Sequence, residues 1–329
     1  MSRRYKGGVI SATPPTTTSG YSGTAPGIWG LQQQFQAQGG GVWPTVNPYP
    51  VISLNANYDG NAYSSGTPSN SGTIQSLTIA TSGTYQFLLI GACGGISNGT
   101  GNASTGRSLT CTIKLNAGEI LWILPGNRGG CSSDSGWGGG GGGGAFLAVG
   151  SSYATATCLA AAGGGGGSHS SSTNSTTNGQ AVTSNGAGGT TTVTQSNRYG
   201  SGGVNGNGGN GNAGPGASGS GASGCGGGFL TDGTGFSFVP HGSAFVNGGG
   251  GGYDGTASHG SGAFGGGGAP DNNGGGAGGG YSGGGNGWNF CTGGGGGSYV
   301  ISTWNSNAVT YTDNGNTTYS SGNGRVYIY

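Results

Sequence analysis

Few residues of this 329-residue chain could carry out acid–base or metal chemistry. Glu119 is the only glutamate, and it follows a turn into a predicted strand. All three histidines lie in Ser/Gly-rich segments and are expected to be exposed loop residues rather than metal ligands: His169, His241 and His259. Four aspartates lie in turn-like contexts: Asp232, Asp254, Asp271 and Asp313. No nucleophile stands in a pattern with a base. The sequence therefore predicts no enzyme and no cofactor or metal.

Aromatic residues, by contrast, are plentiful, with 6 Trp, 15 Tyr and 9 Phe. Many of them lie in the segments between glycine runs, next to Asn and Asp. Aromatic and amide side chains on rigid loops suit the binding of glycan or protein surfaces. The residues predicted to contact a host surface are Tyr253, Asp254, Tyr281, Trp288, Asn289 and Phe290. The alternative is that these aromatic rings clamp the glycine segments inside the protein.

Charge and hydropathy exclude several classes of partner. The eight Lys and Arg residues are scattered and the net charge is +1, so no basic stripe is available for nucleic acid. No apolar stretch approaches the roughly 20 residues that a membrane span needs. The basic N-terminus leads into Gly-Gly-Val-Ile-Ser rather than an apolar signal segment. The chain is expected to be made in a cytoplasm and used elsewhere after release or assembly.

The six cysteines show neither a CxxC pair nor a zinc-binding pattern. One interpretation is that they are small buried hydrophobic residues. The other is that they form disulfides after release, because a glycine-rich fold has little core and gains from cross-links. The sequence does not indicate which cysteines would pair.

Long glycine runs dominate the chain, which has 89 glycines. The clearest are Gly138–Gly144, Gly163–Gly167, Gly248–Gly252, Gly265–Gly268, Gly274–Gly280 (with Ala277 inside it) and Gly293–Gly297. Such runs are typical of flexible linkers, but linkers lack the aromatic residues that flank these runs. No strand–GxGxxG–helix unit or GxxxxGK[ST] motif accompanies them, which argues against a phosphate-binding loop. We interpret the runs as packed rather than flexible.

Polyglycine can adopt the left-handed threefold polyproline-II conformation, whose N–H and C=O groups point sideways. Several such helices can bond to one another because no Cβ holds them apart. Ordering each backbone unit costs about 1–2 kcal/mol, and each hydrogen bond contributes about 0.5–1.5 kcal/mol. A glycine bundle is therefore marginal alone and needs anchoring at its ends or sides. A seven-residue run would span about 22 Å.

The remaining pattern of the body is that of strands. Leu109, Cys111, Ile113 and Leu115 alternate with polar residues, as in a half-buried strand, whereas 85–90 is apolar on both faces, as in a central strand. Further strands are expected at 74–79, 120–124, 146–149, 153–162, 299–301, 309–311 and 325–329. Residues 71–162 and 298–329 are expected to form a jelly-roll-like β-sandwich, with 163–297 inserted as a bundle of polyglycine-II helices. The predicted fold is mainly β.

Residues 1–70 differ from this body, with seven of the 11 prolines and no cysteine. We interpret them as an extended N-terminal arm with at most one short helix. Ile28, Leu31 and Phe35 would share one face of that helix, and Trp29 lies off this stripe. So short a helix needs a partner surface. It could pack on its own body, but we favour docking to a larger assembly.

The body resembles the glycine-rich region of the leukocyte and anaplastic lymphoma receptor tyrosine kinases, and related bacterial and viral glycine-rich proteins. The resemblance covers about 71–329 and rests on 84–95, the run before Ala145–Val149, 158–162 before Gly163–Gly167, and 324–328. It implies a jelly-roll-like β-module with an inserted bundle of polyglycine-II helices. The kinase domain and membrane span of those receptors are absent from this sequence.

The arm resembles the N-terminal segments of marine phage tail and fibre proteins, through Pro14–Thr18 and Gly27–Gln34. In architecture alone, the body is also similar to the polyglycine-packed adhesins of T-even phage fibre tips. These resemblances imply a structural virion protein, tail-fibre or adhesin-like, exposed on the virion. It would dock to other virion proteins through its arm, form a homo-oligomer and attach to a host glycan or protein. The alternative is a self-assembling filament subunit without receptor binding.

Overall fold

The computed structural model describes residues 56–59, 70–97, 103–134, 136–169, 177–182, 185–188, 200–211, 222–235, 239–271, 274–288, 291–317 and 322–329. The chain divides into two compact units, Met1–Pro50 and Val51–Tyr329, and the described residues all belong to the second. The docking residues predicted in the arm, Ile28, Trp29, Leu31 and Phe35, lie outside the described residues.

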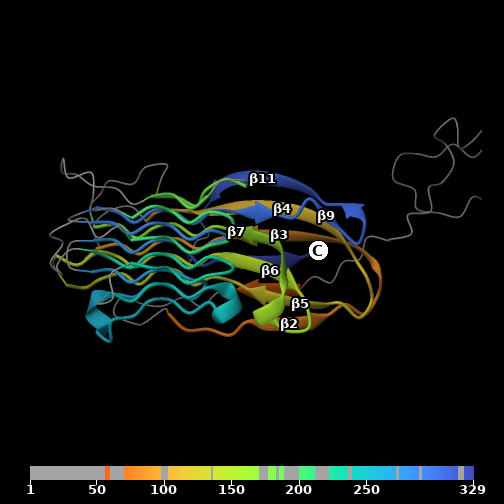
Figure 1. Cartoon of the computed structure of the whole chain (residues 1–329), viewed down its shortest axis with the longest axis horizontal. Helices are drawn as coiled ribbons and strands as arrows, with labels where there is room; N and C mark the ends of the chain where they lie inside the picture. The colour runs from red at the N-terminus through yellow and green to blue at the C-terminus, as the bar shows by residue number, and fades with distance from the viewer. Residues whose placement is uncertain are drawn as a thin grey trace, which may run out of the picture. The chain divides into compact units, whose positions relative to one another are not determined.

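Two five-stranded antiparallel sheets form one half of the second unit (Figure 1). The first sheet has the order β1 (Ala56–Asp59), β12 (Arg325–Ile328), β3 (Gly83–Ile90), β4 (Gly106–Leu115) and β11 (Thr310–Thr317). The second has the order β2 (Gln75–Thr78), β5 (Ile120–Leu124), β6 (Ala145–Val149), β7 (Thr157–Ala162) and β8 (Tyr299–Val300). A hairpin joins β9 (Thr303–Trp304) to β10 (Asn307–Ala308). The predicted mainly β fold, with sheets built from both ends of the body, is confirmed.

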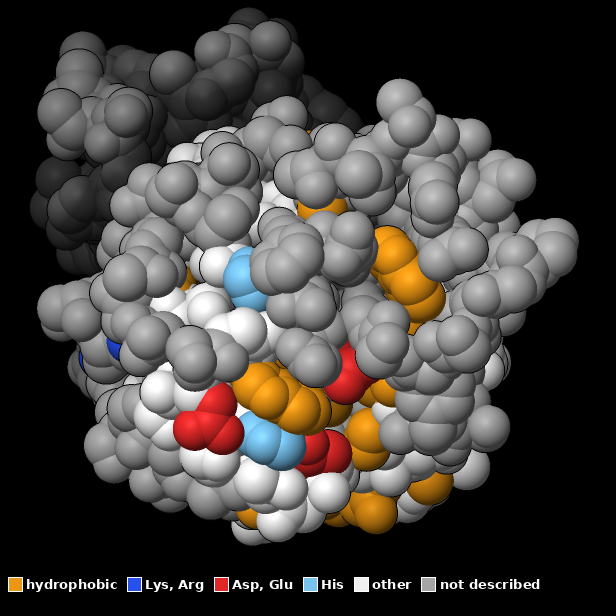
Figure 2. Space-filling view, turned by 90° about the vertical axis from the view of Figure 1, so that its left-hand side faces the viewer, with side chains coloured by type: hydrophobic (Ala, Val, Ile, Leu, Met, Phe, Trp, Pro, Cys, Tyr) orange, Lys and Arg blue, Asp and Glu red, His pale blue; other side chains and the backbone are white. Residues whose placement is uncertain are grey.

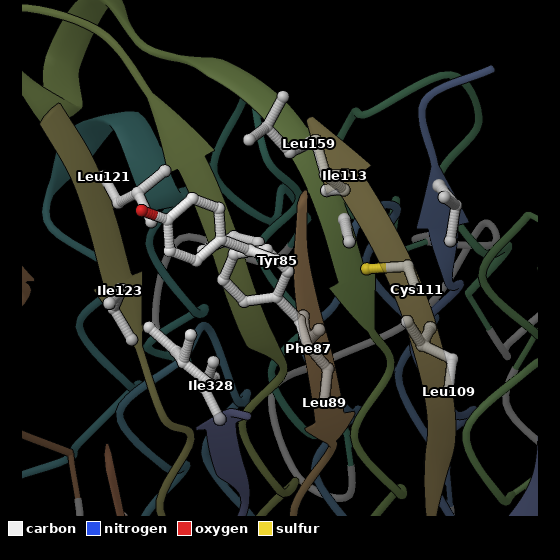
Figure 3. Packing of buried hydrophobic residues seen from close by; sticks show 14 of the residues in the cluster. Tyr85, Phe87, Leu89, Leu109, Cys111, Ile113, Leu121, Ile123, Leu159 and Ile328 are labelled. Atoms are coloured by element: carbon white, nitrogen blue, oxygen red, sulfur yellow. The ribbon is translucent and has the colours of Figure 1, made fainter. Parts of the chain in front are cut away.

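The main hydrophobic core lies between these sheets. Strand β4 buries Leu109, Cys111, Ile113 and Leu115 in alternation, as the sequence predicts. Figure 3 shows Leu109, Cys111 and Ile113 in the same core as Tyr85 and Phe87 from β3 and Leu121, Ile123 and Leu159 from the second sheet. Tyr85 and Phe87 are at most 1% exposed, and burying a side chain of this size contributes about 2–3 kcal/mol.

Three strands differ from the sequence predictions. Strand β3 is central, but Gln86 is exposed and Leu88 half-buried, so its outer face is not fully covered. The segment 153–162 begins as a short 3-10 helix (η1, Tyr153–Thr155) before β7. Strand β11 runs on to Thr317 through a bulge between Asp313 and Gly315. In addition, β1 pairs with β12, so the first sheet includes four residues from the segment assigned to the arm.

One ion pair joins the edge strand β11 to β4. Arg107 Nε lies 2.6 Å from Asp313 Oδ1, and the backbone N–H groups of Gly315 and Val182 donate to the same carboxylate. Burial alone would raise the pKa of Asp313, but the hydrogen bonds and the Arg107 charge outweigh it and hold this pKa below its usual 3.8. The carboxylate therefore stabilises the fold at neutral pH, and this contribution is lost as the pH falls through the lowered pKa.

Glycine segments continue several strands beyond the sheets and form the other half of the unit, where the chain passes back and forth (Figure 1). Strand β5 leads into 125–130, and the run Gly138–Gly144 returns directly into β6. Strand β7 leads into Gly163–Gly167, and Gly293–Gly297 returns toward β8. The described part of 163–297 contains no named strand and only two 3-10 helices, η2 (Phe245–Asn247) and η3 (Ala257–His259). The two sheets thus anchor the ends of the glycine segments.

The hydrogen bonds of Gly138–Gly144 repeat every third residue. Its N–H groups donate in rotation to the backbone carbonyls of three neighbouring segments. Gly138, Gly141 and Gly144 donate to residues 271, 268 and 265 of the first segment. Gly139 and Gly142 donate to residues 168 and 165 of the second, and Gly140 and Gly143 donate to residues 130 and 127 of the third. Its carbonyl oxygens accept from three further segments, through the N–H groups of Ala263, of Gly276 and Gly279, and of Gly95 and Ala92. The run is therefore surrounded by six other segments.

The spacing between these segments leaves no room for a side chain. A Cβ added at Gly141 would lie 1.8 Å from the carbonyl oxygen of Ala277, and one at Gly140 would lie 1.7 Å from that of Ser261. Both contacts are with backbone, which cannot rotate away. Glycine is needed here for close approach rather than for an unusual φ, as at the axis of collagen.

Aromatic residues of the insertion cover the outer face of the second sheet. Phe146 of β6 packs with Phe229, Phe245 and Phe264, all of them at most 3% exposed. The rings of Phe229 and Phe245 stack at 4.9 Å, and those of Phe146 and Phe245 lie 5.3 Å apart. These rings of the insertion are therefore buried against the second sheet.

Five of the six cysteines are buried, and Cys131 is half-buried. Cys93, Cys111, Cys158 and Cys225 are buried thiols without a disulfide. Burial raises the pKa of Cys111 and of Cys225 to about 12, so both remain protonated at neutral pH. The structure thus supports the first of the two interpretations of the cysteines.

Candidate functional site

Two described loops between glycine segments, one before Gly138 and one at 253–260, lie together at the end of the glycine segments away from the sheets. Residues 131–134, 136 and 137 lie there because 125–130 leads away from β5 and 138–144 returns to β6. Figure 2 shows this end face, on which histidine, acidic and hydrophobic side chains lie close together.

A stacked pair of rings forms the centre of the candidate site. The rings of Trp137 and His259 are nearly parallel, with centroids 3.4 Å apart and an interplanar angle of 10°. His259 Nδ1 lies 2.7 Å from Asp254 Oδ2, and its Nε2 lies 3.6 Å from Asp134 Oδ2. The imidazole is thus held between two carboxylates while one of its faces covers the indole. We refer to Asp134, Trp137, Asp254 and His259 as the end-face cluster.

Hydrogen bonds join the two loops that supply this cluster. The Ser258 hydroxyl donates to Asp134 Oδ2 at 2.9 Å, and the Ser133 N–H donates to the Ser258 carbonyl at 2.9 Å. Within its own loop, Asp254 accepts from the Thr256 N–H at 2.8 Å. Both loops are therefore fixed before any partner arrives, which lowers the entropic cost of binding.

The exposure of the cluster leaves polar groups available to a ligand. The side chain of Asp134 is 45% exposed, that of Asp254 24% and that of His259 19%. His169 also lies near this loop, beside the backbone of Gly136; burial lowers its pKa, and the hydrogen bond to Gly136 opposes that effect. An aromatic ring flanked by carboxylates and imidazoles suits the recognition of hydroxyl-rich or cationic surfaces.

The hydroxyl of Ser258 belongs to the hydrogen-bond network of the Asp134 carboxylate. The Ser258 hydroxyl donates to Asp134 and not to His259, so the cluster does not form a nucleophile–base pair. Among the described residues, no group of three His, Cys, Asp or Glu side chains could hold a metal ion. No helix in the described part is long and apolar enough to cross a membrane.

The structure separates the residues that the sequence predicts for surface contact. Asp254 belongs to the end-face cluster, and Tyr253 is half-buried next to it. Tyr281 lies elsewhere, stacked on Tyr299 at 4.1 Å. Trp288 is only 5% exposed and packs against Ala222 and Val239, so it is a core residue and we remove it from the candidate surface. Asn289 and Phe290 lie outside the described residues.

Sequence reasoning missed Asp134, Trp137 and His259. His259 is not merely an exposed loop histidine, since it stacks on Trp137 and contacts two carboxylates. One signal was available: Trp137 directly precedes the longest uninterrupted glycine run. A large ring at the end of a segment that admits no side chain has to lie outside the glycine array.

Comparison with known proteins gives no further guide to the role of this site. No family model matches the chain, and a search of the curated proteins found no match.

Proposed function

We propose that this chain is a structural virion protein of tail-fibre or adhesin type, which attaches to a host surface through the end-face loops. The observation that carries the proposal is the end-face cluster, in which an indole, an imidazole and two carboxylates are held in place at one end of the glycine array. Binding groups on rigid loops are typical of recognition proteins. In this proposal the chain is not an enzyme, is made in the host cytoplasm and is exposed on the virion.

We propose that the array is a bundle of polyglycine-II helices. The three-residue rotation of hydrogen-bond partners around Gly138–Gly144 is what a threefold helix requires. The six surrounding segments fit side-by-side packing of such helices. We further propose that the two sheets form a jelly-roll-like module, because the chain crosses from β2 to β3–β4, back to β5–β7 and again to β11–β12.

The arm completes the proposal. Ile28, Trp29, Leu31 and Phe35 would dock to another virion protein, and the body would assemble as a homo-oligomer facing the host. This part rests on the spacing of these residues and on the resemblance of the arm to phage tail and fibre segments.

Replacing Trp137 by alanine should weaken host attachment about thirtyfold while leaving the fold intact. Trp137 precedes the packed run and lies at the end face, and loss of a central aromatic contact costs about 2 kcal/mol, or roughly thirtyfold in affinity. The measurement is adsorption of the fluorescently labelled full chain to a panel of bacterial isolates. Tyr311→Ala is the matched control, because Tyr311 is 47% exposed on β11 in the sheet half of the unit.

Equal adsorption of the Trp137→Ala variant and the wild type would show that the end face is not the attachment site.

Deleting residues 1–40 distinguishes a docked tail-fibre protein from a self-assembling filament subunit. Tail-fibre docking requires that the deleted chain fails to enter particles yet still adsorbs to cells, whereas normal assembly of the deleted chain contradicts docking. A filament subunit would form fibres and adsorb to no isolate.

A further inference from the structure

A groove beside β8 contains binding groups that the end-face cluster does not use. It has a volume of about 230 Å³, which corresponds to the space of about eight waters in the liquid. The lining residues are Val182, Asn185, Asn205, Tyr281, Ser282, Ser298, Tyr299 and Val300. None of these described lining residues carries a charge at neutral pH.

The wall of the groove is aromatic. Tyr281 and Tyr299 stack with centroids 4.1 Å apart and an interplanar angle of 11°. Tyr281 also lies against Phe229, which fixes the pair from the interior side. Burial, and then the neighbouring Cys158, raise the pKa of both tyrosines above 10, so their hydroxyls remain protonated donors. The pair therefore offers an apolar surface with two polar tips.

The rim of the groove offers amide groups. Asn185 and Asn205 are both exposed, and Asn205 is held in the left-handed region with φ 53°. Within the described part of the chain, their side chains and the hydroxyls of Tyr281 and Tyr299 make no hydrogen bond. The floor is different, because Ser282 and Ser298 are buried and already hydrogen-bonded. The Ser282 hydroxyl accepts from the Gly206 N–H. The Ser298 hydroxyl accepts from the Gly163 N–H and donates to the Gln180 carbonyl. The free donors and acceptors thus lie at the mouth, and the floor is closed.

We propose that this groove binds one ring of a neutral carbohydrate. Sugar rings combine C–H faces that pack on aromatic surfaces with hydroxyls that pair with amides and phenols, and both kinds of group line this groove. The absence of charge among the described lining residues favours a neutral sugar over a sialic or uronic acid, because an anion would lose its hydration here without gaining a cationic partner. The groove gives the protein a second binding site, beside β8 and separate from the residues of the end-face cluster.

The test uses the full chain and four neutral sugars: glucose, galactose, mannose and N-acetylglucosamine. Saturation-transfer NMR should show binding of at least one of them, whereas glucuronic and sialic acid should bind at least tenfold more weakly. Asn205→Gly keeps the left-handed backbone and removes only the amide, and Tyr299→Phe keeps the ring and removes only the hydroxyl. Each variant should weaken binding of the neutral sugar by about tenfold, as expected for loss of one hydrogen bond.

Asn305→Gly provides the matched control, because Asn305 has a similar φ of 49° but lies in the β9–β10 hairpin, where it bonds to Glu119. It should bind the sugar as the wild type does, and so should Trp137→Ala, which affects only the end face. Three results would overturn the proposal: no neutral sugar binds, an acidic sugar binds equally well, or Asn205→Gly and Tyr299→Phe both bind with wild-type affinity.

Discussion

Replacing Gly141 by alanine should lower the free energy of unfolding by about 3 kcal/mol or more, at the upper end of what overpacking a protein interior costs. The added methyl would lie 1.8 Å from the Ala277 carbonyl oxygen, far inside van der Waals contact. This oxygen belongs to a segment that is itself bonded on several sides, so the strain would spread through the array. Gly141→Leu should prevent folding altogether.

Gly250→Ala is the matched control for this prediction. Gly250 also lies within a glycine run, but the nearest atom to its added Cβ would be 3.7 Å away, an ordinary contact, and its backbone is not left-handed. The free energy of unfolding of this variant should lie within about 0.5 kcal/mol of the wild-type value. Thermal or urea unfolding followed by circular dichroism measures both. Equal stability of the two alanine variants would mean that Gly141 does not lie inside a packed array.

Replacing Phe245 by alanine should cost about 3–5 kcal/mol, as for other fully buried phenylalanines. Phe245 is 1% exposed and contacts the rings of Phe146 and Phe229, which links the insertion to the second sheet. Removing it leaves a cavity where the sheet anchors the glycine segments. The contact between the insertion and the second sheet should therefore loosen, and the global stability should fall.

A thiol probe reports this local loosening. Cys158 packs in the same cluster, is 6% exposed and has a pKa raised well above its usual range by burial. Its reaction with a thiol reagent should speed up at least tenfold in Phe245→Ala. Leu230→Ala serves as the control, because Leu230 is 50% exposed and close in sequence to Phe229. An unchanged thiol rate together with wild-type stability would contradict the anchoring role of the cluster.

The sheets were largely predictable from the sequence because their strands carry a hydrophobic signal. Strand β4 alternates in both sequence and burial, and β5 has the predicted bounds. Strand β11 was predicted over only three residues, since its sequence, Thr-Tyr-Thr-Asp-Asn-Gly-Asn-Thr, is polar and contains an Asn-Gly pair typical of turns. An edge strand with little buried area has no apolar pattern by which it could be found.

The site was less predictable, because glycine carries no side chain that specifies its neighbours. The runs indicate extended packed segments, but nothing local shows that Gly138–Gly144 lies against 265–271 or 163–168. The contact of Asp134 with His259, 125 positions later, depends on those pairings. Trp288 illustrates a second difficulty. The sequence pattern of an aromatic residue beside a glycine run is the same for a surface residue and for a core residue, and Trp288 is buried.

The glycine runs form a hydrogen-bonded scaffold, and amide hydrogen exchange tests its rigidity most directly. All seven N–H groups of Gly138–Gly144 donate to backbone carbonyls of other segments. Mass spectrometry of a peptide covering this run should show exchange at least roughly a thousandfold slower than in a free peptide, equivalent to about 4 kcal/mol of protection. Exchange of these seven amides at the free-peptide rate, while β4 stays protected, would show that the runs are flexible linkers.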